Sequence, residues 1–366
     1  MLLRLLLFEP VNIFKLFIMS KSISCSASYG TGGLGLHFTQ IIEDVRSRGN
    51  LAQYYTTQIK KGDSHGNQVI NPLTQYLKYM PVCRDLGWRN YFEGDLFDRA
   101  VANKLSISEE FQGFGGQSLY SFQKARQLGC QSLILTAANS HVNNVLSQHK
   151  KAIRGFGLEK SWLNESQWNK TILEYQEADI IEVVSEYTRR SFLNAGISEH
   201  KLSRKILKIP SRFKPQKYVE DDTFRVVYVG SLTVMKGIPN LIEAFSRFPD
   251  QQARLTLVGG WASRGMRRYI QSWLAKDSRI QVLPGDPLPH LQKASVYVHP
   301  TYEDGFAYAP MEALACGVPV IVTEDTGMKE YVKEGSTGYV VPTGNWESIL
   351  EHLVICKNRN LRGEMG

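Results

Sequence analysis

The feature that most constrains the fold is a regular alternation of short apolar runs with amphipathic helix-like runs. Residues 131–139 (QSLILTAAN) and 224–230 (FRVVYVG) are typical of buried strands, and residues 36–49 and 238–248 carry helical periodicity. Because the alternation continues on both sides of one polar segment, it predicts an α/β protein with two doubly wound, Rossmann-like domains. Ligands of such sheets bind beyond the carboxyl ends of the strands, so we expect the site in the cleft between the domains.

The polar segment that separates the two halves is residues 203–222, which change from basic and proline-bearing to acidic. We expect an N-terminal domain at 19–210, a linker at 211–222 and a C-terminal domain at 223–366. Residues 1–18 are apolar but interrupted by charges and by Pro10. They are too short and broken for a membrane-spanning helix, which needs about 20 apolar residues. They are interpreted as an extension upstream of Met19 from a mis-called start, or as a surface anchor.

The charge balance indicates an anionic partner. Forty-three Lys and Arg against 35 Asp and Glu give a net charge of +8, which suits a phosphorylated ligand, an anionic membrane surface or nucleic acid. The basic residues are scattered, without the stripe interleaved with aromatic residues that nucleic-acid binding favours, so nucleic acid is disfavoured as a partner. The five cysteines are far apart and form no CxxC pair. This favours a cytoplasmic location. The prediction includes peripheral attachment to the cytoplasmic face of the membrane.

A glycine-rich loop follows the first expected strand. Residues 30–35 (GTGGLG) match the GxGxxG pattern of dinucleotide-binding folds. That reading needs an acidic residue at the end of the next strand, where residues 58–62 are QIKKG, so NAD binding is disfavoured. Two readings stay open: a loop whose backbone N–H groups bind phosphate, and a tight turn without a ligand.

The most specific pattern lies at residues 302–320, YEDGFAYAPMEALACGVPV. Pro310 suits the first turn of a helix and Gly317 the position just past its end. This places Glu312 in the first helical turn and Asp304 in the preceding loop, eight positions apart. Glu312 alone could simply complement the helix dipole, worth less than ~1 kcal/mol. The dipole does not explain the Asp-Gly-Phe loop and the closing Gly-x-Pro.

This block, together with residues 177–197, 228–245 and 323–345, resembles the retaining GT-B glycosyltransferases of family 4 (glycosyl transferases group 1). The resemblance implies the GT-B architecture, in which two Rossmann-like domains face each other across a cleft. It implies that the N-terminal domain lies on the acceptor side and that the C-terminal domain binds the nucleotide sugar. It also implies retaining transfer of a hexosyl group from a nucleotide-diphosphate sugar to a hydroxyl of a glycan, a lipid or a small molecule. Polysaccharide biosynthesis is a typical setting. In this family the chain usually continues through a last helix, so the C-terminal domain is expected to be truncated at its end.

The resemblance also implies roles for single residues. Glu312 stands where the family grips the ribose hydroxyls, Asp304 faces the donor sugar and Lys236 neutralises the diphosphate. His141 stands about where a histidine lines the sugar site, with a surface-loop histidine as the alternative, whereas His299 is expected to be structural. The expected catalytic residues are Asp304, His141 and Lys236, and the expected nucleotide-sugar-binding residues are Gly33, Gly35, Ser231, Lys236, Phe306, Ala307, Tyr308 and Glu312.

Three departures from the family pattern bear on activity. Asp304 is one methylene shorter than the usual glutamate, Ala307 replaces a glycine, and Ser231 replaces an arginine that would pair with phosphate through two hydrogen bonds. The missing charge could come from one of the arginines in the helix-like run at 264–276: Arg264, Arg267 or Arg268. No metal-ligand cluster is visible, so neither a cofactor nor a divalent ion is expected.

Two other functions fit the same architecture. A GT-B-fold sugar epimerase would change the donor alone, and a non-catalytic scaffold would bind a nucleotide sugar without turnover. A phosphorylase of this shape would need a lysine that holds pyridoxal phosphate, and no convincing context for one is present. Product analysis without an acceptor distinguishes the epimerase from the transferase.

Overall fold

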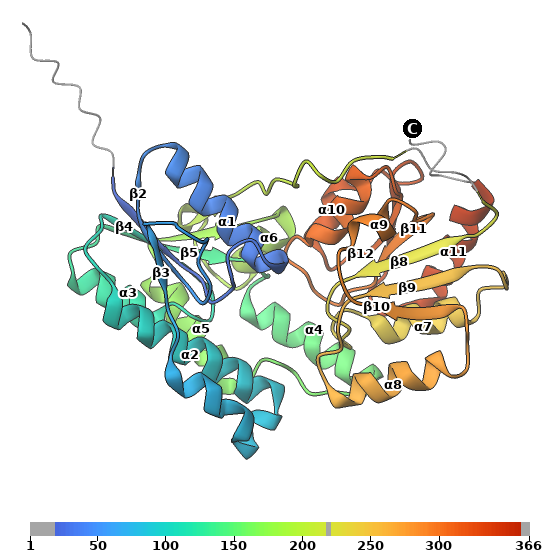
Figure 1. The fold of residues 1–366 in the computed structure, drawn as a ribbon, viewed down its shortest axis with the longest axis horizontal. Helices are drawn as coiled ribbons and strands as arrows, with labels where there is room; N and C mark the ends of the chain where they lie inside the picture. Colours follow the sequence, from blue (N-terminus) through green and yellow to red (C-terminus); the bar gives the residue numbers. More distant parts are fainter. Residues whose placement is uncertain (1–18, 217–220, 360–366) are drawn as a thin grey trace, which may run out of the picture.

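The computed structural model describes residues 19–216 and 221–359, which form two α/β domains lying side by side (Figure 1). This confirms the predicted pair of doubly wound, Rossmann-like domains. The chain leaves the first sheet at Arg204 and enters the second at Arg225. No helix within these ranges has the length and apolar character needed to cross a membrane. The expectations about residues 1–18 and about the end of the C-terminal domain beyond residue 359 lie outside the described residues.

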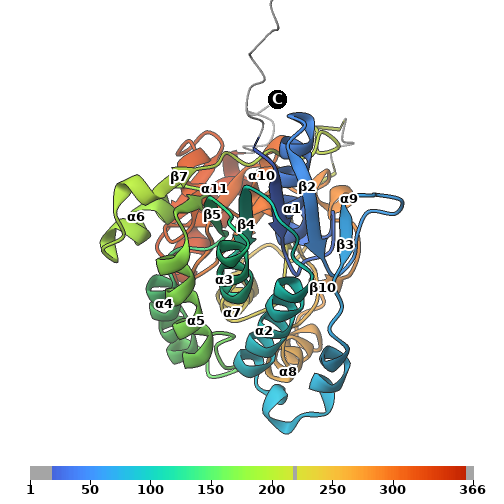
Figure 2. The same cartoon turned by 90° about the vertical axis from the view of Figure 1, so that its left-hand side faces the viewer.

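The N-terminal domain is built on a seven-stranded, wholly parallel sheet in the order β3-β2-β1-β4-β5-β6-β7. The order reverses between β1 and β4, which is the switch point where such sheets bind ligands. Its strands are β1 (Lys21–Ser24), β2 (Leu51–Thr56), β3 (Gly66–Gln68), β4 (Glu110–Phe114), β5 (Ser132–Ala137), β6 (Ile180–Val183) and β7 (Leu202–Arg204). Its helices are α1 (Gly32–Ser47), η1 (Pro72–Tyr79), η2 (Pro81–Arg84), α2 (Leu86–Lys104), α3 (Leu119–Gln127), α4 (Val142–Gly155), α5 (Glu165–Glu177), α6 (Glu186–Asn194) and η3 (Glu199–Lys201). Figure 2 shows helices of this domain on the side that faces the viewer.

The C-terminal domain has a six-stranded parallel sheet in the order β10-β9-β8-β11-β12-β13, with its switch point between β8 and β11. Its strands are β8 (Arg225–Val229), β9 (Arg254–Val258), β10 (Ile280–Leu283), β11 (Val296–His299), β12 (Val320–Thr323) and β13 (Gly338–Val341). Its helices are α7 (Ile238–Ser246), α8 (Arg264–Leu274), α9 (Leu288–Leu291), α10 (Tyr308–Ala315), η4 (Gly327–Tyr331) and α11 (Trp346–Arg359).

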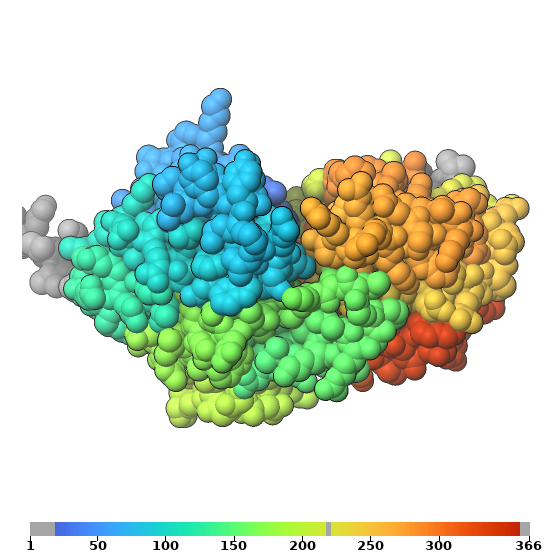
Figure 3. Space-filling view, turned by 90° about the horizontal axis from the view of Figure 1, so that it is seen from below, coloured from blue at the N-terminus to red at the C-terminus, as the bar shows by residue number. Residues whose placement is uncertain are grey.

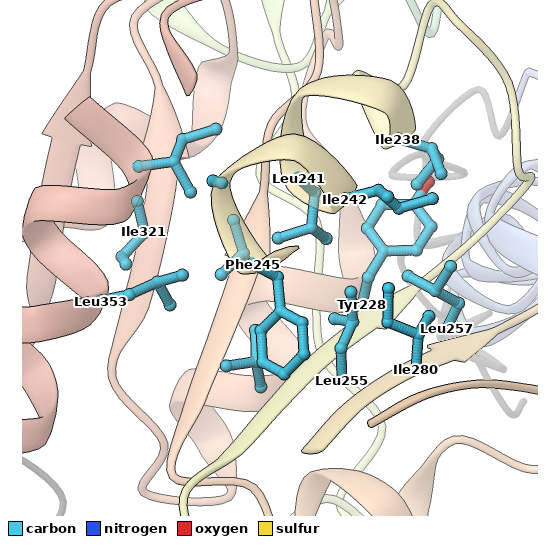
Figure 4. Packing of buried hydrophobic residues seen from close by; sticks show 14 of the residues in the cluster. Tyr228, Ile238, Leu241, Ile242, Phe245, Leu255, Leu257, Ile280, Ile321 and Leu353 are labelled. Carbon is cyan, nitrogen blue, oxygen red and sulfur yellow. The ribbon is translucent and has the colours of Figure 1, made fainter. Parts of the chain in front are cut away.

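The apolar runs of the sequence become the cores on both faces of the second sheet. On one face, Ile238, Leu241 and Phe245 of α7 pack against Leu255 and Leu257 of β9, and all five side chains are fully buried (Figure 4). A separate cluster that includes residues of α10 covers the opposite face. A parallel strand buried on both faces must be apolar throughout, which is why these strands read as unbroken hydrophobic runs.

The two domains contact each other through loops, and also where Arg204 of β7 and Tyr187 of α6 meet Glu330 of η4. The backbone N–H of Ser140 donates to Oε1 of Glu303 over 2.9 Å, and Oγ of Ser185 donates to the carbonyl of Gly305 over 2.6 Å. A separate contact lies near the lower edge of Figure 1, where Glu159 of the α4–α5 loop accepts a hydrogen bond from Oγ of Ser263. In Figure 3 the green segment of the first domain accordingly lies against the orange part of the second.

Candidate active site between the two domains

A cavity of about 970 Å³ lies between the domains, where the carboxyl ends of both sets of strands face each other. From the first domain it is lined by the glycine loop before and at the start of α1 and by Ala138 and Asn139 after β5. From the second domain it is lined by the ends of β8, β9 and β11 and by the loop that leads into α10. Of the residues expected from the sequence, the structure brings into this lining Gly33, Ser231, Lys236, Asp304, Phe306, Ala307, Tyr308 and Glu312.

Lys236, Asp304 and His299 form a charged cluster on the wall of this cavity. Nζ of Lys236 lies 2.6 Å from Oδ2 of Asp304, and Nε2 of His299 lies 3.3 Å from the same oxygen. Burial raises the pKa of Asp304, but the nearby Lys236 charge and the His299 hydrogen bond outweigh it, so this pKa falls below its usual range. Asp304 is therefore a carboxylate at neutral pH, held in place from two sides.

His299 has a larger part in the site than its expected structural role. It ends β11, is 3% exposed, lines the cavity and is stacked with Tyr228 and Tyr297. Burial lowers its pKa despite the neighbouring carboxylate of Asp304, which favours the neutral imidazole. The position of His299 at the end of a strand was predicted from the sequence, but only the packing shows that its ring points toward Asp304.

Two further carboxyl groups, one in the cavity lining (Glu312) and one next to Asp304 in the chain (Glu303), are in a different electrostatic state. Glu312 is 6% exposed, and burial raises its pKa to about 7, against a lowering by Arg212. Glu303 is 5% exposed, and burial together with the Asp304 charge raises its pKa to about 7. The pKa values of these adjacent residues thus shift in opposite directions, since Asp304 has a cationic partner and the buried Glu303 accepts a hydrogen bond from the neutral backbone of Ser140.

Glycines at the strand ends leave bare backbone along the floor of the cavity. Gly230, Gly259 and Gly285 follow the ends of β8, β9 and β10, and all three line it with positive φ. A Cβ on Gly259 would lie 2.0 Å from the carbonyl oxygen of Gly230, so a side chain does not fit there. Exposed backbone of this kind lets a bulky anionic ligand approach the main-chain N–H groups closely.

The glycine loop of the first domain faces this floor. Gly33 is exposed, and a Cβ placed on it would lie 3.6 Å from the ring of Tyr308 across the cavity. Gly35 does not line the cavity. It is buried, and a Cβ there would lie 2.3 Å from the carbonyl oxygen of Ser28. Gly33 therefore serves the cavity wall, and Gly35 serves the close packing of α1 on the preceding loop.

The loop into α10 is strained at the residue that replaces the usual glycine. Ala307 has φ 65° and ψ 105°, and it is the one non-glycine residue with positive φ in the part of the chain that the structure describes. The neighbouring Phe306 is buried, and the hydroxyl of Tyr308 is buried without a hydrogen-bond partner. Alanine rarely adopts such a conformation, so the surrounding contacts must enforce it.

The second positive charge at the cavity comes from an unexpected place. Ser231 is exposed on the wall and brings no charge, and none of Arg264, Arg267 and Arg268 lines the cavity. Arg212 does line it and forms an ion pair with Asp286, with 3.0 Å between nitrogen and oxygen. Sequence reasoning missed Arg212 because this arginine belongs to the expected linker, whose path no local pattern specifies.

The structure does not bring His141 into the cavity lining. Its side chain caps the start of α4, where Nδ1 accepts a hydrogen bond from the backbone of Asn143 over 3.2 Å. The ring is 3% exposed and packs on Tyr175 and Phe192, and burial lowers its pKa to about 4. The neighbouring Asn139 lines the cavity instead.

The donor set does not suggest a resident metal. Across residues 19–216 and 221–359 no group of three or more His, Cys, Asp or Glu side chains is arranged to hold an ion. Asp304 itself is engaged by a lysine and a histidine. That transfer needs no divalent ion stays a prediction.

With this geometry described, the comparisons with known proteins become informative. Residues 210–365 match the family model "Glycosyl transferases group 1". The capsular polysaccharide biosynthesis glycosyltransferase CapM of Staphylococcus aureus is 28% identical over 152 residues, which are 40% of each chain. The matched part thus spans well under half the length of that curated relative.

Solved structures resemble the whole described fold. Sucrose-phosphate synthase from Thermosynechococcus elongatus has a TM-score of 0.72 at 18% identity, covering 95% of this chain and 94% of its own. HepE from Anabaena, solved in complex with UDP-glucose, has a TM-score of 0.68 at 14% identity, covering 95% and 93%. At these sequence identities the solved structures show similarity of fold alone. The family model shows, in addition, sequence similarity over the C-terminal domain. Residues 210–365 therefore match the glycosyl transferases group 1 in sequence, and the described fold is the two-domain GT-B architecture.

Proposed function

We propose that this protein is a retaining glycosyltransferase that moves a hexosyl group from a nucleotide-diphosphate sugar to a hydroxyl of a glycan, a lipid or a small molecule. The observation that carries the proposal is that Lys236, Asp304 and Glu312 share one inter-domain cavity, opposite the glycine loop at Gly33. The structure of HepE in complex with UDP-glucose supports a donor of this class for the shared fold. CapM, a relative through the C-terminal domain, is named for capsular polysaccharide biosynthesis, which supports a similar setting.

The donor diphosphate is assigned to the floor of strand-end glycines. Lys236 and Arg212 supply positive charge there, and the backbone N–H groups of the glycines and of the first turn of α10 supply hydrogen-bond donors. Glu312 is the fifth residue of α10, just past the first turn in which the sequence predicted it, and it receives the ribose hydroxyls. Those hydroxyls would hydrogen-bond to a carboxyl group that is otherwise buried, with a pKa of about 7.

In the proposed reaction the protein forms no covalent bond to the sugar, and its role is to position the substrates and to stabilise charge. As the bond between sugar and diphosphate breaks, positive charge develops on the sugar and negative charge on the leaving phosphate. Lys236 stabilises the leaving charge, and the ionised Asp304 faces the sugar. The leaving phosphate takes the proton of the acceptor hydroxyl, which attacks on the same face and so retains the configuration. A double displacement through Asp304 is the alternative route to the same stereochemistry.

The test compares two variants of the cavity with two matched surface variants. We expect Glu312→Ala and Lys236→Ala each to lower transfer sharply and to reduce the thermal stabilisation by UDP-, GDP- or ADP-sugars, which scales with donor affinity. Glu351→Ala and Lys333→Ala, at exposed positions of the same domain, serve as controls. Circular dichroism checks that each variant is folded. Wild-type transfer rates in both cavity variants would refute the proposal.

The two alternatives give different products. An epimerase would convert the nucleotide sugar in the absence of any acceptor, whereas a transferase leaves the sugar configuration of its donor unchanged. A scaffold would bind the donor without turnover, and Glu312→Ala would leave that binding unaffected. Chromatography of the donor after incubation with and without acceptor separates the three.

A further inference from the structure

A second, smaller cavity of about 280 Å³ opens beside the donor cavity, wholly within the N-terminal domain. It lies at the carboxyl ends of β4 and β5, between α2 and α5. Leu34, Ala138 and Asn139 line both cavities, so the two adjoin at these residues. Its volume is slightly below the roughly 300–1,000 Å³ of typical ligand pockets, which suits a single small ring rather than an extended chain.

Two buried glutamines line this cavity, and each leaves one end of its amide group without a protein hydrogen-bond partner. Gln117 is 8% exposed, and its Oε1 accepts from the backbone of Ser26 over 2.6 Å. Gln167 is 4% exposed, and its Nε2 donates to the carbonyl of Gly116 over 3.1 Å and to Thr171 over 3.3 Å. Among the described residues, neither Nε2 of Gln117 nor Oε1 of Gln167 has a protein partner.

These two unpaired groups are one donor and one acceptor. Neither atom is sealed from solvent, so water or a ligand hydroxyl in the cavity can complete its hydrogen bonds. A sugar hydroxyl both donates and accepts, and therefore matches the pair. Trp162, Phe114 and Leu163 complete the lining with aromatic and apolar surface, on which the C–H face of a sugar ring can pack.

The loop that carries Gln117 is held rigidly. The buried carboxyl group of Glu174 accepts hydrogen bonds from the backbone N–H groups of Gly116 and Ser118, on either side of Gln117. Behind it, Nζ of Lys170 pairs with Asp95 at 3.1 Å and Asp98 at 2.9 Å, joining α5 to α2. A fixed loop holds the glutamine at a defined position, as hydrogen-bond selection requires.

The charge of the lining excludes an anionic ligand. Glu93 is the one charged residue among those that line this cavity, and neither lysine, arginine nor histidine is among them. A phosphate group entering it would lose its hydration without a cation in the lining, because Arg89, outside the lining, is already paired with Glu93 over 2.9 Å. The donor cavity next to it has the opposite character, with Lys236 and Arg212 in its lining.

We propose that this cavity holds an uncharged, hydroxyl-bearing ring of the acceptor, and that Gln117 and Gln167 select such a ring over a phosphorylated one. The inference rests on the proposed function, since it assigns the ring next to the donor as the group that receives the sugar. It assigns to Gln117 and Gln167 a role in specificity, through contact with the acceptor ring.

The test measures binding without a donor, so that it is independent of transfer. Saturation-transfer NMR is recorded with the methyl glycosides of glucose, galactose and mannose and with the 6-phosphates of the same sugars. We expect at least one uncharged glycoside to bind and its phosphate to bind at least tenfold more weakly. Gln167→Ala and Gln117→Ala should each weaken the glycoside at least tenfold. The matched control is Gln112→Ala, which removes a glutamine that is 1% exposed in β4 and lines neither cavity.

A charge exchange at the cavity mouth provides a second, independent variant. Glu93 is exposed, so Glu93→Arg should fold normally and shift the preference toward the sugar phosphate, while Glu93→Gln should shift it less. Equal or tighter binding of the phosphates by the wild type would overturn the inference, and so would failure of every uncharged glycoside to bind. UDP-sugar stabilisation is measured on the same samples. Absence of that stabilisation alone would contradict the proposed function, while glycoside binding that depends on Gln117 and Gln167 would still show that the cavity holds an uncharged ring.

Discussion

The strain at Ala307 makes a quantitative prediction. A non-glycine residue in a sparsely populated φ/ψ region costs about 1–3 kcal/mol, and Ala307→Gly removes that cost. Against it stand about 0.4–1 kcal/mol from the greater freedom of glycine in the unfolded chain. Ala307 is only partly buried, so the lost methyl burial costs about half of the ~0.8 kcal/mol expected for a fully buried group. The balance is a gain of about 1 kcal/mol.

The same substitution two residues later is the matched control. Ala309 is also partly buried and also lines the cavity, but it lies within α10. There Ala309→Gly should cost about 0.5–1 kcal/mol, because glycine loses more freedom in a helix than alanine does. The two changes remove the same methyl group and differ in the backbone conformation of the site.

Thermal unfolding and urea denaturation of the two variants beside the wild type form the assay. For a domain of 150–250 residues, 1 kcal/mol corresponds to roughly 2–4 °C in Tm, so the two variants should move in opposite directions by a measurable amount. Donor binding should persist in Ala307→Gly, because glycine adopts the observed φ without strain. If both variants lowered stability equally, the strain argument would be refuted.

Three further predictions follow from buried charge, backbone contact and exposed surface. Burial raises the pKa of Glu303 to about 7, so the native state keeps a proton that the unfolded chain releases near pH ~4.3. The free energy of unfolding should therefore fall as the pH rises between these values. When denaturation is compared at pH 5 and pH 8, this fall should be smaller in Glu303→Gln. An unchanged difference between the two pH values would contradict this. Gly259→Ala would place a Cβ 2.0 Å from the carbonyl oxygen of Gly230 and should reduce both stability and donor binding. Gly260 has open space around it, so Gly260→Ala should preserve the Tm. Similar Tm values for both variants would argue against a closely packed cavity floor. The expected contact with an anionic membrane surface stays a prediction. The side chains to test are Leu73 and Tyr79 of η1, which are 56% and 72% exposed. If that surface is used, the double variant Leu73→Ser, Tyr79→Ser should sediment less with anionic vesicles.

Features with a repeating or local physical cause could be predicted from the sequence. The strand–helix alternation predicted both parallel sheets because burial on both faces requires continuous apolar strands. The family resemblance predicted Lys236, Asp304 and Glu312 at one site, and the structure gives the physical reason: the segments that carry them follow strands at the same edge of one sheet. Pro310 and Gly317 marked the helix between them, and the structure places α10 at Tyr308–Ala315.

Directions of side chains set by distant elements could not be predicted. Glu303 and Asp304 are adjacent, yet one faces Ser140 of the other domain and the other faces Lys236, a difference that spacing along the chain does not encode. The ring of His141 turns away from the cavity because Tyr175 of α5 and Phe192 of α6 provide its packing. Only the assembled fold brings these residues together.

The attachment of the acidic loop to the opposite domain has a consequence for turnover. The loop that presents Asp304 is flanked by two hydrogen-bonded ties to the first domain, from Ser140 to Glu303 and from Ser185 to Gly305. Any separation of the domains wide enough to release a spent nucleotide must break these ties. The reactive geometry around Asp304 would then be assembled anew in every cycle, and the rate of domain reassociation would set an upper limit on kcat.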